Sequence, residues 1–283
     1  MKNIIYILIA GLFLFSACDK IEAPYFIVNP NVVIVDTFPP LDRTSVYRKI
    51  LIEEYTGHYC TNCPVGHAKI SELSLFFGDT LVSVCIHAGM LAKPRPSGLY
   101  VYDFTTIEGE QLYNDFNIDG IPVAVVNRRK FGGNNWALGV DQWKNAIENV
   151  VRTVYAGIQI QTKKIEKDIL EIATKTTMLE NYNSPLRLSI FLMEDNIIKP
   201  QLNNNVNDEE YQHNHVLRAV LNSTYGAPIP PNGFFAKDSA YVLGYHLNFK
   251  DKDWKMENCT VVVFLHDPET KEVLQVEVKK LSL

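Results

Sequence analysis

Residues 54–64 read EYTGHYCTNCP, and this stretch holds two cysteines, Cys60 and Cys63, separated by two residues. A strand-like apolar run over residues 50–55 leads into it, and a helical pattern follows it. A cysteine at a helix start has its thiolate, the reactive form, stabilised by unpaired backbone N–H groups and by the helix dipole. Cys63, one turn further on, is placed to resolve a mixed disulfide, and Pro64 is tolerated in the first turn of a helix. The stretch therefore predicts a redox-active dithiol between a strand and a helix.

The surrounding sequence predicts an α/β domain over residues 46–155, with a mixed sheet flanked by helices. Short apolar runs are typical of buried strands, and runs with a period near 3.6 are typical of helices. The expected elements are a strand at 50–55, a helix at 60–77, a strand at 81–86, a helix from 105 toward 116, a strand at 123–126, a weak hairpin strand and a closing helix around 143–151. Residues 89–104 contain Pro94, Pro96 and Gly98, so we expect them to leave the regular fold as an excursion.

Beyond residue 155 the sequence changes to β-rich runs separated by turns, with no strong helical period. We therefore expect an antiparallel β-sandwich domain over residues 156–283. The runs are 158–161, 169–177, 186–193, 241–249, 260–266 and 273–278. Their alternation is imperfect, and the order of the strands does not follow from it.

The first residues are typical of a processing segment rather than of a fold. Lys2 precedes an apolar run over residues 4–14, which is too short to span a bilayer. Phe15-Ser16-Ala17-Cys18 resembles the lipobox of bacterial lipoproteins, so we expect a signal peptide over residues 1–17 and lipidation of Cys18. Acyl chains on this cysteine would anchor the protein to a membrane. A plain secretory signal with a coincidental cysteine is the alternative.

Residues 18–45 contain four prolines and no helical period, so we expect a tether, with one extended piece at residues 31–35 that pairs with a sheet edge. Removing the signal peptide, whose one charged side chain is Lys2, lowers the net charge from −5 to −6. An acidic chain without a basic run gives no electrostatic reason to bind nucleic acid. Export also permits disulfide bonds.

Two separated features resemble the thioredoxin superfamily: Cys60-Thr61-Asn62-Cys63 between a strand and a helix, and Gly120-Ile121-Pro122 before a later strand. The resemblance implies that the Ile121–Pro122 peptide bond is cis and that Pro122 packs beside the dithiol. It also implies a role for Glu54, which stands six residues before Cys60. In thioredoxins the corresponding position holds a buried acid that helps to move the proton of the resolving cysteine.

The physical chemistry of Glu54 agrees with that role. A carboxyl on a central strand is costly to ionise, so its pKa rises and it can exchange protons near neutral pH. Alternation along the strand puts Glu53 and Glu54 on opposite faces, so one of them alone can hold the position. The alternative is that either glutamate is solvated at the strand end.

A narrower resemblance covers most of the mature chain. Residues 53–57, the motif at 60–64 with Gly66-His67, and the later stretch Tyr211–Arg218 are similar to the Omp28-related outer-membrane lipoproteins of Bacteroidetes. The resemblance implies a thioredoxin-like domain followed by a β domain. It also implies a lipid-anchored protein of the cell envelope, at the outer membrane.

Other chemistries suit the polar residues less well. Cys60, Cys63, His58 and His67 could gather a soft metal ion, but a buried zinc site usually has a second ligand pair elsewhere, so we predict neither a metal nor another cofactor. The run His213-Asn214-His215 invites a nuclease interpretation, but contiguous letters are no catalytic geometry and the chain is acidic and exported. We expect these two histidines at a strand or loop edge.

The remaining cysteines are Cys85 and Cys259. Cys85 lies inside an apolar run, so we expect an inert core thiol. A disulfide between the two would have to bridge the two expected domains, and it is the less favoured alternative.

Two functional hypotheses follow. The leading one is an extracytoplasmic, lipid-anchored thiol–disulfide oxidoreductase that acts on cysteine-containing exported proteins. In it Cys60 is the exposed nucleophile, Cys63 resolves, Pro122 shapes the substrate groove and Glu54 assists proton transfer. The competing hypothesis is a non-enzymatic surface or scaffold protein that keeps a thioredoxin fold as a binding module with a permanent disulfide.

Overall fold

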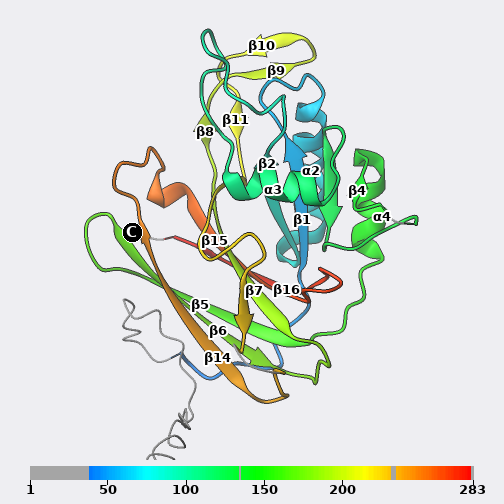
Figure 1. Ribbon diagram of the computed structural model, residues 1–283, viewed down its shortest axis with the longest axis vertical. Coiled ribbons are helices and arrows are strands. Elements are labelled where there is room, and N and C mark those ends of the chain that lie inside the picture. Colours follow the sequence, from blue (N-terminus) through cyan, green and yellow to red (C-terminus); the bar gives the residue numbers. More distant parts are fainter. Residues whose placement is uncertain (1–37, 134, 231–233, 282–283) are drawn as a thin grey trace, which may run out of the picture.

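The computed structural model describes residues 38–133, 135–230 and 234–281, in which a mixed β-sheet and a smaller antiparallel sheet account for most of the regular structure (Figure 1). The expected signal peptide, the lipidation site Cys18 and the extended piece at residues 31–35 lie outside these residues. In the part of the chain that is described, no helix is long and apolar enough to cross a membrane.

The central sheet contains nine strands within the described residues. They are β1 (Ile50–Thr56), β2 (Leu81–His87), β3 (Val123–Val126), β4 (Ala137–Leu138), β7 (Leu186–Glu194), β12 (Val216–Val220), β13 (Ala227–Ile229), β15 (Cys259–His266) and β16 (Val273–Lys280). Their order is β16-β15-β7-β12-β2-β1-β3-β4, and β13 pairs with β7. β1 runs parallel to β2 and antiparallel to β3, whereas β12 joins β2 at Val216 and Cys85. Strands from before and after residue 155 therefore share one sheet.

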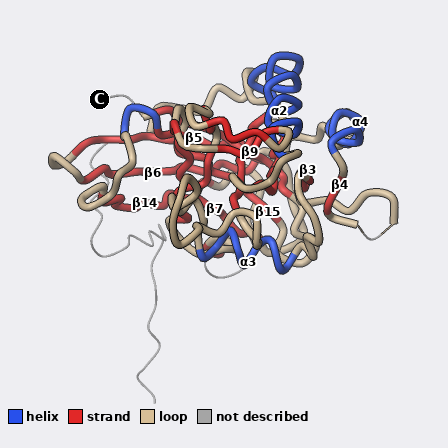
Figure 2. Tube along the Cα trace, turned by 90° about the horizontal axis from the view of Figure 1, so that it is seen from above, coloured by secondary structure: helices blue, strands red, loops and turns tan. Residues whose placement is uncertain are grey.

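Helices cover both faces of this sheet (Figure 2). They are α2 (Cys63–Phe77), α3 (Ile107–Asp115) and α4 (Trp143–Glu148), with 3-10 turns η2 (Gly78–Thr80), η3 (Val140–Gln142) and η4 (Met256–Asn258). Side chains alternate along a strand, so β1 serves both faces. Ile50 and Ile52 pack in the cluster that contains α2 and α4, whereas Leu51 and Tyr55 pack in the cluster that contains α3.

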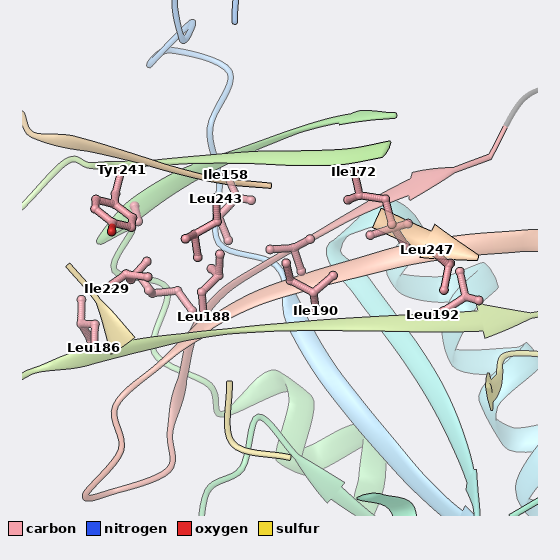
Figure 3. Packing of buried hydrophobic residues seen from close by; sticks show 14 of the residues in the cluster. Ile158, Ile172, Leu186, Leu188, Ile190, Leu192, Ile229, Tyr241, Leu243 and Leu247 are labelled. Atoms are coloured by element: carbon pink, nitrogen blue, oxygen red, sulfur yellow. The ribbon is translucent and has the colours of Figure 1, made fainter. Parts of the chain in front are cut away.

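The second sheet packs on strands β7 and β15 of the central sheet. It consists of β5 (Ala156–Lys164), β6 (Ile169–Met178) and β14 (Ala240–Asn248), which are antiparallel in the order β14-β6-β5. Figure 3 shows Ile158 and Leu243 of this sheet facing Leu188 and Ile190 of β7, within one buried cluster. Each fully buried Leu or Ile stabilises the fold by about 1.5–3 kcal/mol, so this cluster holds the two sheets together.

Two short hairpin-like pairs complete the described strands. β9 (Gln201–Asn203) pairs with β10 (Val206–Asp208), and β8 (Ile197–Ile198) pairs with β11 (Gln212–His213), both antiparallel. All four strands lie between β7 and β12 in the chain. Figure 1 shows β9 and β10 at the end of the molecule where β1 leads into α2.

The last residues of the predicted tether run along β5. The carbonyl of Pro39 accepts a hydrogen bond from the Gln159 side chain at 3.0 Å. Leu41 packs where a side chain on Gly157 would have to be, because a Cβ added there would lie 2.5 Å from the leucine. These contacts attach the start of the described chain to the second sheet.

Candidate active site

The two cysteines of the motif form a disulfide at the N-terminus of α2. Their Cα atoms are 5.4 Å apart. The sequence predicted that the helix begins at Cys60, but it begins three residues later, at Cys63. Tight turns take up the intervening residues, closed by hydrogen bonds from the Cys60 amide to the Gly57 carbonyl and from the Cys63 amide to the Cys60 carbonyl. Pro64, which has no N–H, occupies the first helical turn.

Pro122 lies beside this disulfide. The Ile121–Pro122 peptide bond is cis, as expected. Cys60 Sγ is 3.7 Å from the carbonyl oxygen of Ile121. Gly66, on the first turns of α2, is packed so closely that a Cβ added to it would lie 3.0 Å from Pro122 Cβ. The start of α2 and the residues before β3 are therefore in direct contact.

Glu54 lies beneath the same part of α2. Its side chain is fully buried, and a Cβ on Gly66 would come within 2.4 Å of Glu54 Oε1. Oε2 accepts a hydrogen bond from the Cys85 thiol at 3.2 Å, whereas Oε1 has no hydrogen-bond partner among the described residues. Burial raises the pKa of Glu54 to about 8, and the Cys85 hydrogen bond opposes the rise. The carboxyl can thus hold or release a proton near neutral pH.

The sequence predicted an inert core thiol at Cys85, whereas in the structure this thiol donates a hydrogen bond to Glu54. It is buried and free, and its hydrogen bond to Glu54 joins β2 to β1. Burial, and then the neighbouring Glu54, raise the pKa of the Cys85 thiol well above its ordinary value. Cys85 is therefore a hydrogen-bond donor to the carboxyl. Cys259 is also buried and free, so the two do not form a disulfide.

Glu53 occupies the opposite face of β1, as alternation requires. Its carboxylate accepts hydrogen bonds from Arg128 Nε at 2.8 Å and from Arg128 Nη2 at 2.7 Å, and both side chains are fully buried. The alternative in which either glutamate is solvated at the strand end is wrong, because Glu53 and Glu54 are both inaccessible. Glu54 is the one that faces α2.

His67 and Tyr211 continue the polar contacts of Glu54. His67 Nε2 lies 3.8 Å from Glu54 Oε1 and 2.8 Å from Thr56 Oγ1. Its Nδ1 lies 2.7 Å from the Tyr211 hydroxyl. Burial, with a smaller contribution from His215, lowers the pKa of His67 to about 4, so the ring is neutral at pH 7. A neutral imidazole has one donor and one acceptor nitrogen.

A cavity of about 290 Å³ opens next to this chain of contacts. It is lined from α2 by Pro64, His67, Ala68, Ile70 and Ser71, from β2 by Cys85 and His87, and from the later segment by Asn203, Tyr211, Gln212, His213, Asn214 and His215. His87 and His213 are almost inaccessible, with ring centroids 5.6 Å apart. Burial lowers the pKa of His213 to about 3, so this ring is also neutral at pH 7.

Among the described residues, the structure does not bring these histidines together with other metal ligands. Within residues 38–133, 135–230 and 234–281, no three His, Cys, Asp or Glu side chains are arranged to hold a metal ion. His213 lies on the short strand β11 with its side chain turned inward, whereas His215 contacts the carboxylate of Asp195 at 3.2 Å.

Two segments cover the disulfide. The side-chain amide of Gln201, on β9, donates to the carbonyls of Cys60 at 3.0 Å and Gly57 at 3.3 Å. The backbone amide of Leu202 donates to the His58 carbonyl at 2.8 Å. On the other side, within the predicted excursion 89–104, the carbonyl of Leu91 accepts from the Tyr59 amide at 3.0 Å. The sequence predicted an exposed nucleophile at Cys60, but beneath these two segments Cys60 is 3% exposed and Cys63 is fully buried.

Sequence reasoning brought together Cys60, Cys63, Pro122 and Glu54, and the structure places all four around the start of α2. It missed the contributions of His67, Tyr211 and Gln201 to this site. The sequence presents His67 as a possible metal ligand, and its place one turn after Cys63 is the signal that could have assigned it to the site. Tyr211 and Gln201 stand about 140 residues further along the chain, and no local pattern links them to the motif.

Comparison with known proteins gives a family and a fold. The chain matches the model of a family described as outer membrane protein Omp28 over residues 109–282, a region that contains Pro122 and Tyr211 but begins after the dithiol. HBP35 of Porphyromonas gingivalis is similar in structure, with a TM-score of 0.64 at 18% identity over 84% of this chain and 76% of that one. This likeness concerns the fold alone.

A domain of the outer membrane lipoprotein Omp28 from Porphyromonas gingivalis is 21% identical, with a TM-score of 0.32 over 46% of this chain and 89% of that domain. No curated protein matches the chain.

Proposed function

The chain belongs to the Omp28 family of outer membrane proteins, and from the geometry of its site we propose that it is an extracytoplasmic thiol–disulfide oxidoreductase of the cell envelope. Family membership assigns it to the outer membrane. Lipidation of Cys18 is the expected means of attachment, since several acyl chains give firm membrane binding. The proposed partners are thiols or disulfides of exported proteins.

The proposal includes a finer description of the fold. Residues 46–155 are proposed to be a thioredoxin-like unit, in which β1, the dithiol turn, α2 and β2 precede α3 and the antiparallel strands β3 and β4. The sheet β14-β6-β5, packed on β7 and β15, is proposed to be the β-sandwich part of residues 156–283. Fold alone does not assign activity, so the argument for function rests on the site.

One observation carries the functional proposal: the Cys60–Cys63 disulfide lies against Ile121–Pro122, with the buried carboxyl of Glu54 under the same helical turn. A dithiol needs a proton acceptor for its resolving thiol, and a carboxyl whose pKa burial raises to about 8 can act as one near neutral pH. Pro122 and the Ile121 carbonyl form the wall next to which a substrate sulfur would approach Cys60.

In the reducing direction, the Cys60 thiolate attacks a substrate disulfide and releases one substrate thiolate, which takes a proton from water. Cys63 then loses its proton to the Glu54 carboxylate and attacks Cys60 Sγ. The Cys60–Cys63 disulfide forms and the second substrate thiolate leaves, so two electrons pass from the dithiol to the substrate. With a substrate dithiol the same steps run in reverse and a substrate disulfide is formed.

A second candidate function is supported by the cover over the motif. Cys60 is 3% exposed beneath Gln201 and the excursion 89–104, an arrangement that suits a permanent disulfide in a scaffold or binding protein. In that case exchange would not occur, and the β-rich part would carry recognition.

Trapping of mixed disulfides distinguishes the two functions. The Cys63→Ser variant of an oxidoreductase accumulates covalent partners on Cys60, which are separated by non-reducing electrophoresis and identified by mass spectrometry. The matched control, Cys60→Ser/Cys63→Ser, retains the buried thiols of Cys85 and Cys259 and should trap nothing. Absence of adducts on Cys63→Ser, together with a disulfide that resists dithiothreitol, would refute the oxidoreductase and support the scaffold.

A further inference from the structure

Glu54 has no direct contact with solvent, so a proton that it takes from Cys63 needs a way out. The carboxyl is fully buried, with β2 on one side through Cys85 and with Gly66 of α2 above it. The Cys85 thiol donates its one proton to Oε2, although Cys85 also lines the cavity. Oε1 makes no hydrogen bond among the described residues, and His67 Nε2 lies 3.8 Å from it.

From this geometry we infer that His67 and Tyr211 form a proton path that connects Glu54 to the 290 Å³ cavity and serves the exchange reaction of Cys60 and Cys63. The inference rests on the proposed function, and it names two residues that the dithiol mechanism does not by itself require. The path runs from Glu54 Oε1 to His67 Nε2, across the ring to Nδ1, and on to the Tyr211 hydroxyl.

Each link has a measurable geometry. The distance from His67 Nδ1 to the Tyr211 hydroxyl is 2.7 Å, a normal hydrogen bond. The distance from Glu54 Oε1 to His67 Nε2 is 3.8 Å, so the carboxyl or the ring must move by about 1 Å to reach hydrogen-bond range. In this structure Nε2 contacts Thr56 Oγ1 at 2.8 Å, and that hydroxyl holds the ring in place between transfers.

The solvent end of the path is Tyr211, which is partly exposed and lines the cavity together with Gln212, Asn214 and His215. Tyr211 and its neighbours reach this position because β12 lies next to β2 in the central sheet. Residues of α2 line the same cavity, so a water molecule in the cavity would contact the Tyr211 side chain.

The protons balance over a catalytic cycle. Glu54 gives its proton to His67 Nε2 as Nδ1 gives one to the Tyr211 oxygen, and the original hydroxyl proton of Tyr211 passes to water. One proton leaves the protein, and His67 changes tautomer without acquiring a charge. When a dithiol or disulfide partner returns the motif to its starting redox state, one proton travels inward and restores the first tautomer.

The titratable groups around the path favour this neutral relay. They include Glu54 on β1, His67 on α2, Cys85 and His87 on β2, Asp208 on β10, Tyr211, His213 and His215 from the segment before β12, and Asp195, which contacts His215. Burial lowers the pKa values of His67 and His213 to about 4 and about 3, and it lowers that of His87 well below its ordinary value. Burial likewise raises the pKa of Tyr211, which keeps its hydroxyl protonated.

Tyr211→Phe tests the path with the loss of one oxygen atom. The first measurement is the rate at which the reduced protein is oxidised by a model peptide disulfide, followed from about pH 5 to pH 9. We expect Tyr211→Phe to lower this rate by at least about tenfold near pH 7, a smaller factor than the about 10²–10⁴ that a general acid or base typically contributes. His67→Gln should lower it similarly. Tyr182→Phe, which removes a partly buried hydroxyl bonded to Asp267 outside the site, is the matched control and should keep the original rate.

Two further measurements separate a failed path from a failed function. Adduct formation in a Cys63→Ser background does not use Glu54, so Tyr211→Phe should leave it unchanged. After a pH jump on the oxidised protein, time-resolved infrared spectroscopy follows the carboxyl band of Glu54, assigned by its loss in Glu54→Gln. We expect that band to respond at least about tenfold more slowly in Tyr211→Phe.

If the unmodified protein exchanges disulfides while Tyr211→Phe and His67→Gln retain its rate and its pH profile, the path is refuted and the function stands. If no exchange occurs in the unmodified protein, the function fails. The infrared response then decides alone whether the path exists, and equal rates in the two proteins would overturn it.

Discussion

Replacing Glu54 by glutamine tests whether this carboxyl is protonated in the folded protein at neutral pH. Burial raises its pKa from an ordinary value of 4.5 to about 8. Between these two values the folded protein binds one more proton than the unfolded chain. The free energy of unfolding contributed by this group is therefore present in full below pH 4.5 and falls as the pH rises toward 8.

The expected size follows from the two pKa values. The linkage relation gives a loss of about 3 kcal/mol in the free energy of unfolding between about pH 5 and about pH 8. Glutamine carries no such proton. Its extra N–H bonds add a cost that does not depend on pH, because they are never ionised. The stability of the Glu54 protein relative to the variant should thus fall by about 3 kcal/mol over this range.

Urea denaturation of both oxidised proteins at several pH values between about 5 and 8 measures this difference. The matched control is Glu72→Gln, which changes an exposed carboxylate on α2 that is paired with Lys69. For this control, the difference in the free energy of unfolding between variant and parent protein should vary by less than about 0.5 kcal/mol over the same pH range. A Glu54→Gln difference that is constant with pH, or that changes in the opposite direction, would show that the pKa of Glu54 is not raised in the fold and would refute its exchange of a proton near neutral pH.

Three further substitutions test other contacts. Arg128→Met leaves the buried Glu53 carboxylate without its partner, so the free energy of unfolding at pH 7 should fall by about 3–5 kcal/mol in urea denaturation. Gly66→Ala puts a Cβ 2.4 Å from Glu54 Oε1, so overpacking should cost about 1–3 kcal/mol in thermal unfolding despite the better helix propensity of alanine. Gln201→Leu removes the amide that holds β9 on the motif, so dithiothreitol should reduce the disulfide about tenfold faster, measured by alkylation of the freed thiols.

Each of these three substitutions has a matched control substitution elsewhere in the chain. Arg43→Met breaks an exposed ion pair and should cost less than about 1 kcal/mol. Gly120→Ala meets no atom within 4 Å and should leave the melting temperature nearly unchanged. Gln212→Leu changes an exposed glutamine outside the cover and should keep the original reduction rate. Equal effects in a substitution and its control would contradict the corresponding assignment.

The first half of the chain was predictable because its signals are local. The strand at 50–55, the strand at 81–86 and the strand at 123–126 are β1, β2 and β3, and the helices at 60–77 and 105–116 are α2 and α3 with later starts. Apolar runs and helical spacing depend on which face of a local segment is buried. They can therefore be recognised without knowledge of the tertiary fold.

The stretch between β7 and β14 was not predictable in the same way. Its strands β8 to β13 are two to five residues long, too short to establish a period of two. Their partners lie far away in the chain, and β12 joins the sheet beside β2 through a single pair, Val216 and Cys85. The sequence therefore suggested no strand where the site receives Gln201 and Tyr211.

Local sequence was enough to predict the dithiol and its position between a strand and a helix. It was also enough to divide Glu53 and Glu54 between two faces, because adjacent residues on a strand must point in opposite directions. Strand alternation did not say which glutamate lies under α2, since that depends on the face each helix covers; the resemblance pointed to Glu54, and the tertiary structure places it there. The tertiary structure alone decided that Gln201 covers the disulfide and that Tyr211 reaches His67. Contacts between residues over a hundred positions apart depend on sheet order, which local periodicity does not encode.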